Sequence, residues 1–204
     1  SDNNASGCTA CGTGYTTDNA GDGAGTTAQN SCICDVGYGR SVANTASCVQ
    51  CGAGTWKGAT GDVVCTNAAA GRFTANAGGT QVSIGAVKEV DCGVGYYSAG
   101  AQAACTGATQ GNYAAADNGD EGSATATQSL QCTAGTWSDN NASGCTACGT
   151  GYTTDSAGDG AGTTAQNSCI CDVGYGRASN ASPCQQCGAG TWKGATDDVV
   201  CTNA

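Results

Sequence analysis

The stretch CGTGYTTDNAGDGAGTTAQNSCICDVGYGRSVANTASCVQCGAGTWKGATGDVVC, residues 11–65, holds six cysteines. Three of them begin the motifs CGTGY, CDVGY and CGAGTW, in which a glycine and then an aromatic residue follow the cysteine. The same opening returns at Cys92, Cys132, Cys148, Cys171 and Cys187. Glycine permits a tight or left-handed turn beside a disulfide, and Tyr or Trp can cover the bridge. The motif therefore predicts small modules, each opened by a cysteine.

The spacing favours a disulfide from each opening cysteine to the next cysteine along the chain. Six of the eight resulting loops are nearly equal in length, and the other two are longer and equal to each other. The predicted pairs are Cys11–Cys32, Cys34–Cys48, Cys51–Cys65, Cys92–Cys105, Cys132–Cys145, Cys148–Cys169, Cys171–Cys184 and Cys187–Cys201. Cys8 is left over, and we expect its partner to lie outside this segment. Connectivity does not follow from sequence alone, and a second scheme would pair Cys65 with Cys92 and Cys105 with Cys132, which also encloses two loops of equal length.

An internal repeat sets the organisation of the chain. Residues 1–40 and 138–177 match at 39 of 40 positions, and Asn19 becomes Ser156. We therefore assign 1–137 as one full period and 138–204 as the first half of the next, a segment of a longer tandem array. The sub-modules expected in the first period are 11–33, 34–50, 51–65, an insert at 66–91, 92–105, an insert at 106–131, and 132–147.

Composition points to a small disulfide-rich fold. Leu, Ile, Val and Phe together number 17 of 204 residues, too few for an ordinary core, whereas Cys alone numbers 17. Disulfides must replace the missing core, which predicts an oxidising compartment, extracellular or at the cell surface. We expect mostly loops and short β ribbons, arranged as an elongated tandem-repeat rod.

The two cysteine-free stretches, 66–91 and 106–131, are expected to be hairpin-like inserts. One strand is predicted at Gln81–Val90, with Val82 and Ile84 on its buried side. A second is predicted at Ser123–Gln131.

The charge excludes one class of partner. The net charge is −10, and the six basic residues are scattered singly, so nucleic acid is not expected. No stretch of the chain is apolar enough to span a membrane, so a membrane would be reached only through an anchor outside this segment.

Two acidic, glycine-rich loops are weak calcium candidates, because carboxylate oxygens are the ligands that Ca²⁺ prefers. Solvated turns are the alternative interpretation. The candidate residues are Asp18, Asp22, Asp117, Asp120, Glu121, Asp155 and Asp159. No cofactor is expected.

Asn-x-Ser sequons at Asn4, Asn141 and Asn180 are candidate N-glycosylation sites in a secreted protein. Enzyme activity is not expected, because the chain has no His and no nucleophile beside a base. The C-x-x-C pairs are interpreted as joints between disulfide loops, with zinc or redox chemistry as the alternative.

The cysteine spacing resembles known families. CICDVGYGRSVANTASC resembles the C-terminal half of an epidermal-growth-factor-like module, and CVQCGAGTWKGATGDVVC resembles ephrin-receptor-like, or growth-factor-receptor-like, cysteine-rich repeats. Tandem arrays of this kind, rich in Ala, Thr and Gly, resemble the immobilisation-type surface antigens of ciliates. The resemblance implies a secreted or lipid-anchored coat protein without enzymatic activity.

The function expected from these observations is structural: a surface coat or extracellular filament whose partners are copies of itself and glycans. The alternative is an adhesin or receptor-type binding ectodomain, which would need an exposed patch outside the duplicated sequence. Most aromatics are expected at module cores, namely Tyr15, Tyr38, Trp56, Trp137, Tyr152, Tyr175 and Trp192. Phe73, Tyr113 and Tyr97 are the expected exceptions, so the binding alternative points to residues 66–131.

Overall fold

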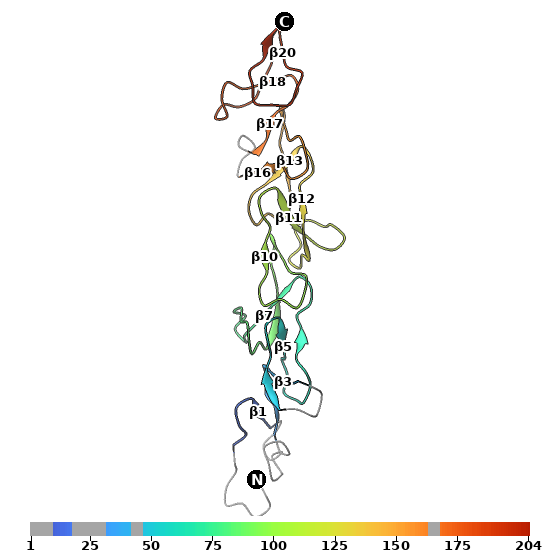
Figure 1. The fold of residues 1–204 in the computed structure, drawn as a ribbon, viewed down its shortest axis with the longest axis vertical. Coiled ribbons are helices and arrows are strands. Elements are labelled where there is room, and N and C mark those ends of the chain that lie inside the picture. The colour runs from blue at the N-terminus through green and yellow to red at the C-terminus, as the bar shows by residue number, and fades with distance from the viewer. Residues whose placement is uncertain (1–9, 18–31, 42–46, 163–167) are drawn as a thin grey trace, which may run out of the picture. The chain divides into compact units, whose positions relative to one another are not determined.

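A computed structural model of the 204-residue chain describes residues 10–17, 32–41, 47–162 and 168–204. These residues form short antiparallel ribbons joined by loops (Figure 1), and their strands are two to four residues long. Among them, no helix is long and apolar enough to cross a membrane. The chain divides into two compact units, Ser1–Cys92 with Ser98–Cys105, and Gly93–Tyr97 with Thr106–Ala204.

The ribbons form between strands that are neighbours along the chain, except that one intervening strand pairs elsewhere. They pair β1 (Tyr15–Thr16) with β2 (Ile33–Cys34), β3 (Tyr38–Arg40) with β4 (Cys48–Gln50), β5 (Thr55–Trp56) with β6 (Thr66–Asn67), β7 (Arg72–Ala75) with β8 (Lys88–Asp91), β9 (Tyr96–Tyr97) with β10 (Thr106–Gly107), β11 (Asn112–Ala115) with β12 (Gln128–Gln131), β13 (Thr136–Ser138) with β14 (Thr146–Ala147), β15 (Tyr152–Thr153) with β17 (Ile170–Cys171), β18 (Tyr175–Gly176) with β19 (Gln185–Gln186), and β20 (Thr191–Trp192) with β21 (Thr202–Asn203). β16 (Gly160–Ala161) adds in parallel to β13.

Eight disulfides close the ribbons, and they are the eight pairs of the scheme that the spacing favoured. The second scheme is wrong, because Cys65 is bonded to Cys51 and Cys92 to Cys105. Cys8 lies outside the described residues. The chain therefore has a small disulfide-rich fold of loops and short ribbons, built from repeated units.

One register rule relates every disulfide to its ribbon. In the ribbon of β5 and β6, Thr55 lies opposite Asn67. The disulfide joins the residue four positions before Thr55 to the residue two positions before Asn67, which are Cys51 and Cys65. The same two offsets relate all eight disulfides to the first residue pair of their ribbons. Each ribbon with its opening turn is therefore one copy of a single module.

The two predicted inserts do form hairpins, and the rule shows that they have the register of the modules. Arg72 lies opposite Asp91, and Asn112 lies opposite Gln131. The offsets then put Ala68 and Glu89, and Ala108 and Ser129, at the cysteine positions. Both stretches are modules of the same fold without the disulfide. We number the ten modules of the described chain as 11–33, 34–50, 51–67, 68–91, 92–107, 108–131, 132–147, 148–170, 171–186 and 187–204, so that module 4 (68–91) and module 6 (108–131) are the unbridged ones.

The opening turn explains why the glycine recurs. In module 3 the N–H of Thr55 donates to the carbonyl of Gly52, and Gly54 has φ +74°. A turn with a positive φ at its third residue needs glycine there, as in a type II turn. The N–H of Ala68 then donates to Gly54 O at 2.8 Å, so the same glycine also holds the first residue of the next module. In module 4 the equivalent residue, Gly71, has φ +77° and accepts from Cys92.

The strand predicted at Gln81–Val90 is mostly wrong. Only β8 (Lys88–Asp91) is a strand, preceded by isolated bridges at Gln81 and Ala86. Ile84 is 60% exposed, although we expected it to be buried. Gly85, with φ +63°, interrupts the alternation before β8. The strand predicted at Ser123–Gln131 is likewise confined to β12 (Gln128–Gln131).

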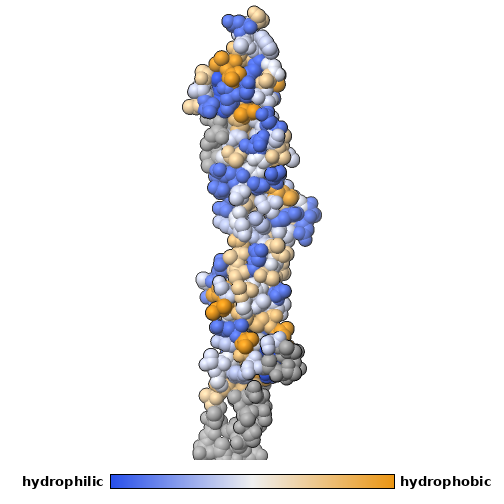
Figure 2. Space-filling model, in the orientation of Figure 1, coloured by the Kyte–Doolittle hydropathy of each residue, from blue (hydrophilic) through white to orange (hydrophobic). Residues whose placement is uncertain are grey.

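The buried apolar residues are small. They are mostly half-cystines and alanines, including Cys34, Cys51, Ala75, Ala114 and Ala126, all at most 1% exposed. In one unit Tyr97 packs against a cluster of Ala108, Ala114 and Ala126. Most of the described valines are exposed, and hydrophobic residues form separate patches on the visible face (Figure 2). Disulfides and backbone hydrogen bonds thus take the place of a conventional core.

Candidate functional site

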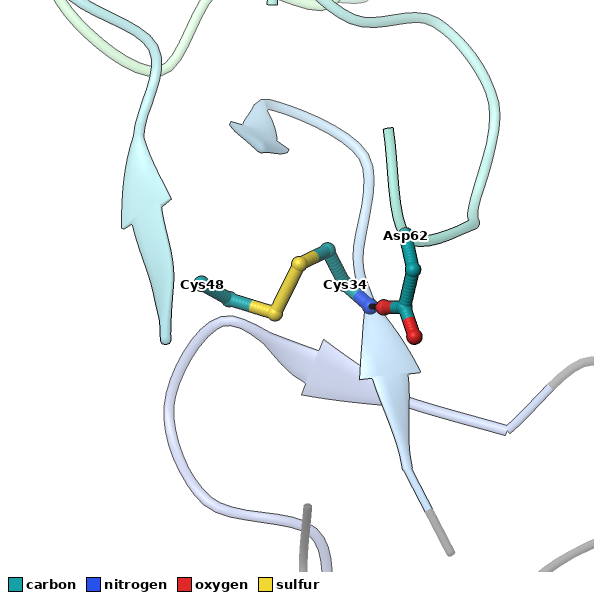
Figure 3. Close-up of side chains that lie close together, drawn as sticks. All are labelled: Cys34, Cys48 and Asp62. Carbon is teal, nitrogen blue, oxygen red and sulfur yellow. Dashed lines mark hydrogen bonds between the residues drawn. A yellow bond between two sulfur atoms is a disulfide. The ribbon is translucent and has the colours of Figure 1, made fainter. Parts of the chain in front are cut away.

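The contact between modules 2 and 3 is built around the disulfide Cys34–Cys48 (Figure 3). Asp62, which follows β5, accepts the N–H of Cys34 at its Oδ1, at 3.1 Å. Its Oδ2 lies 2.6 Å from Nη2 of Arg40, whose side chain is only 7% exposed. The hydrogen bond from Arg40 is the largest cause that lowers the pKa of Asp62. The carboxylate therefore ties a module-3 loop to two elements of module 2.

Lys57 enters the same interface from the end of β5. Its Nζ donates to the carbonyls of Cys34 and Asp35, at 3.2 and 3.1 Å. Lys57 is 5% exposed, and burial lowers the pKa of its ammonium group against the opposing charges of Asp35 and Asp62. Basic residues that the sequence shows as scattered single charges are thus interior parts of a module junction.

The second copy repeats this network between modules 9 and 10. Asp198 pairs with Arg177 and accepts the N–H of Cys171 at 3.1 Å. Lys193 Nζ donates to the carbonyls of Cys171 and Asp172. The copies differ at one position of this network, where Asp197 replaces Gly61. The Oδ1 of Asp197 lies 3.0 Å from Lys193 Nζ, so that ammonium group has an ion-pair partner that the first copy lacks at this position.

This cluster does not suit a metal ion. Sulfur atoms of Cys34 and Cys48 and a carboxylate oxygen of Asp62 lie within 4.8 Å of one another, as do those of Cys171, Cys184 and Asp198. The metal ligand, however, is the thiolate, and both sulfurs are consumed in a disulfide. The Asp62 oxygens already accept hydrogen bonds from Cys34 and Arg40. The arrangement acts as a structural junction.

A second contact, made by the main chain, recurs between successive modules. In it, a loop residue of one module donates its N–H to the carbonyl of the first residue of the preceding module; we call this contact the staple. The staples are Gly61 to Cys34 (2.8 Å), Gly85 to Cys51 (2.8 Å), Ala101 to Ala68 (2.8 Å), Asn141 to Ala108 (2.7 Å), Gly158 to Cys132 (2.7 Å) and Asp197 to Cys171 (3.2 Å). The contact does not depend on the disulfide, because Ala68 and Ala108 accept as the cysteines do.

Each of four staples also touches the module before its acceptor. A Cβ on Gly54 of module 3 would lie 1.9 Å from the carbonyl oxygen of Ala101 in module 5. The equivalent distances are 2.0 Å from Gly95 to Asn141, 2.4 Å from Gly111 to Gly158, and 2.6 Å from Gly37 to Gly85. The turn glycine is therefore required twice, for its positive φ and for this approach of another backbone. Three consecutive modules interlock at each such point.

Two unusual backbone conformations occur at staple donors, although Asp197 donates in a staple without a positive φ. Ala101 (φ +52°) and Asn141 (φ +57°) are the non-glycine residues with positive φ in the described part of the chain. Both are staple donors, and glycines hold the corresponding place at Gly85 and Gly158. Sequence reasoning missed the staple, because neither Ala101 nor Asn141 lies in a motif that marks a turn.

The predicted aromatic cores are confirmed only in part. Trp56 and Trp137 are half-buried, and each forms a parallel bridge with a small residue of the following module, Ala86 or Gly160. Trp192, the twin of Trp56, is 57% exposed, so its assignment to a core is wrong for this chain. Tyr15 instead reaches forward, and its hydroxyl accepts the N–H of Cys48 at 3.1 Å. Tyr152 repeats that contact with Cys184.

The calcium candidates are not brought together. The groups of three potential ligands among the described residues include none of Asp117, Asp120, Glu121, Asp155 or Asp159. Asp117 accepts from Thr127, and Asp120 accepts from Asn118 at 2.6 Å. These bonds are typical of solvated turns. Asp18 and Asp22 lie outside the described residues.

Two glycosylation candidates lie at the surface. Asn141 and Asn180 are both exposed, whereas Asn4 lies outside the described residues. Backbone hydrogen bonds to module 6 hold the Asn141 sequon. The carbonyl of Ala142 accepts the N–H of Ala114 at 3.0 Å, and the carbonyl of Ser143 accepts the N–H of Gly122 at 2.6 Å. The Asn180 sequon lies in the loop before Cys184, where Ser182 N–H donates to Ser179 O.

Comparison with known proteins adds no family. No protein-family model matches the chain, and a search of curated proteins gave no match.

Proposed function

We propose that the protein is a non-enzymatic, extracellular structural repeat protein that forms a surface coat or an extracellular filament. The single observation that carries this proposal is the staple, which recurs in six places with the same donor and acceptor roles. A contact that recurs at most of the junctions between neighbouring modules lets an array grow by adding copies. The eight disulfides support an oxidising compartment, because such bonds persist outside the reducing cytosol.

The proposal includes a relationship to the immobilisation-type surface antigens of ciliates, on the ground of cysteine spacing. It includes N-glycans at Asn141 and Asn180, whose side chains lie at the surface. Copies of the same chain are the proposed partners.

The structure gives the binding alternative no distinct patch among the described residues. Ile84, Val94 and Tyr96 are exposed in the stretch that is not duplicated. Val63 and its twin Val199 are just as exposed, at 58% and 52%, in the duplicated part. Exposed apolar side chains are therefore a property of the module rather than of one region, which favours the structural role.

Electron microscopy of the source material tests the proposal. The label is an antibody against the loop TTDNAGDGAGTTAQN, residues 16–30. Label along discrete fibres would establish a filament subunit, and the axial spacing would report the period of the sequence repeat. A layer over the cell surface would establish a coat. Label confined to the cell interior would overturn the proposal.

A further inference from the structure

Tension on this chain would follow a short covalent path. When a cross-linked chain is pulled from its ends, force passes through each disulfide and leaves the enclosed loop unloaded. In modules 1 to 3 the path runs from Cys11 to Cys32, from Cys34 to Cys48 and from Cys51 to Cys65. At most two residues of backbone lie between consecutive bridges there. These modules can rotate against one another but cannot lengthen appreciably.

Modules 4 and 6 interrupt this path. Between Cys65 and Cys92 the load must pass along the whole of 66–91, which no disulfide crosses. Between Cys105 and Cys132 it must pass along 106–131, a stretch of the same length that again has no bridge. Since a fully extended chain spans at most about 3.5 Å for each residue, each stretch can reach about 90 Å.

Non-covalent contacts alone hold module 4 closed. The ribbon of β7 and β8 has four residue pairs, and the pair at its open end is Arg72 and Asp91. Arg72 Nε lies 2.9 Å from Asp91 Oδ1, and its Nη1 lies 2.6 Å from Glu89 Oε1. The chain enters and leaves the ribbon at this open end, so tension loads one residue pair at a time. A ribbon loaded in this way unzips, whereas a bridged ribbon holds at its disulfide.

Module 6 has the same geometry with fewer charges. The pair Asn112 and Gln131 stands at the open end of β11 and β12. Gln128 Nε2 donates to Ala116 O at 3.0 Å, and Thr127 donates to Asp117. Among the ion pairs of the described residues, none joins β11 to β12. Hydrogen bonds therefore close the ribbon of module 6, where ion pairs contribute in module 4.

We propose that modules 4 and 6 are extensible elements, which open under tension while the eight bridged modules stay closed. The inference rests on the proposed structural function, where it supplies a second property: a coat or filament that stretches in two fixed steps in each period of the repeat. The steps are reversible, because opening breaks hydrogen bonds and ion pairs but no covalent bond.

Single-molecule force spectroscopy on the full oxidised chain, held at both termini, tests this proposal. We expect two extension events, each releasing up to about 90 Å less the folded span of its module. The proposal would be overturned if no discrete event appeared before the attachment at the termini broke. Events of other lengths would also overturn it.

A pair of variants assigns the events. Ala68→Cys with Glu89→Cys places cysteines at the two bridge positions of module 4, and oxidation would leave only positions 66, 67, 90 and 91 in the loaded path. We expect one of the two events to disappear, and to return when the bridge is reduced. Ala108→Cys with Ser129→Cys does the same for module 6 independently, and Ala68→Ser with Glu89→Ser controls for the substitutions themselves. Persistence of both events in the two oxidised variants would refute the assignment.

The two proposals fail separately. Intracellular label in the microscopy would remove the structural function while leaving the extension events of the isolated chain in place. Absence of events in the force experiment would remove the extensible elements and leave the coat or filament untouched.

Discussion

Modules 3 and 4 are neighbours with the same turn and the same ribbon register, yet one is closed by a disulfide and the other by a carboxylate. In module 3 the positions are filled by Cys51 and Cys65. In module 4 Glu89 stands at the place of Cys65, and its Oε2 accepts the N–H of Ala69 at 2.8 Å. Its other oxygen pairs with Arg72. The turn and the ribbon register therefore define the module, and the disulfide secures it without specifying it.

Removing the bridge from module 3 is the change with the largest expected effect. Cys51→Ala with Cys65→Ala should cost about 3 kcal/mol of local stability, the value expected for a loop of about 15 residues. The ribbon register should survive, as it does in module 4. Amide hydrogen exchange of residues 55–67 measures the loss, and the intact twin at 191–203 is the internal reference. Unchanged protection would mean that the disulfide contributes nothing beyond the staple.

The turn glycine is the next test. Gly54→Ala should cost at least about 2 kcal/mol, because a left-handed non-glycine residue costs about 1–2 kcal/mol and the new Cβ would also meet the Ala101 carbonyl oxygen at 1.9 Å. Gly52→Ala is the matched control, since nothing lies within 4 Å of its Cβ position. Exchange of the Ala101 amide, which donates to Ala68, reports the staple directly. Equal effects of the two substitutions would contradict the three-module interlock.

The glycine and the disulfides are also the features that the sequence predicts best. Cys-x-x-Gly is a local signal, since the turn lies within a few positions of the cysteine, and near-constant loop lengths single out one pairing. Cysteine positions alone predict inserts where modules 4 and 6 lie. AAAGRF (68–73) and ATQGNY (108–113) nevertheless carry the same glycine and aromatic spacing with alanine in the first position, so the signal for a module is present in both.

The junction network could not be predicted in the same way. Arg40 and Asp62 are far apart in the sequence, and only the register of two separate ribbons brings them within 2.6 Å. Alternation predicts that Ile84 is buried, but Gly85 donates to Cys51 in a staple and breaks the strand before β8. In both cases a contact between modules decides the structure, and a pattern within one module does not report it.

Acid should destabilise module 4 more than module 3. Burial works to raise the pKa of Glu89, but the N–H of Ala69 and the charge of Arg72 outweigh it and lower the pKa. A carboxyl group whose pKa is lower when folded stabilises the fold above its unfolded pKa, which is about 4.3 for Glu. That contribution is lost as the pH falls through the lower, folded value. We therefore expect module 4 to loosen under acid while the bridge keeps module 3 closed.

Glu89→Gln is the variant that isolates this effect. It keeps an oxygen acceptor but removes the charge, which should cost about 1 kcal/mol at neutral pH, the difference between charged and neutral hydrogen bonds. Protection of the Ala69 amide, followed from neutral pH into acid, should fall in the parent chain and stay flat in the variant. A parallel pH dependence in both chains would show that another group is responsible.

The smallest expected effect is a gain in stability when the residue that donates in a staple is changed to glycine. Ala101 has a φ of +52° where its N–H donates in a staple, and Gly85 has a φ of +63° in the equivalent position. Ala101→Gly removes a left-handed penalty of about 1 kcal/mol or more but adds about 0.5–1 kcal/mol of unfolded-state entropy, so a net gain of about 0.5 kcal/mol is expected. Asn141→Gly should gain less, because Asn tolerates the left-handed region better than Ala. Thermal unfolding of the two variants ranks them, and a loss of stability in Ala101→Gly would mean that the methyl group packs usefully and that the strain at the staple is smaller than its φ implies.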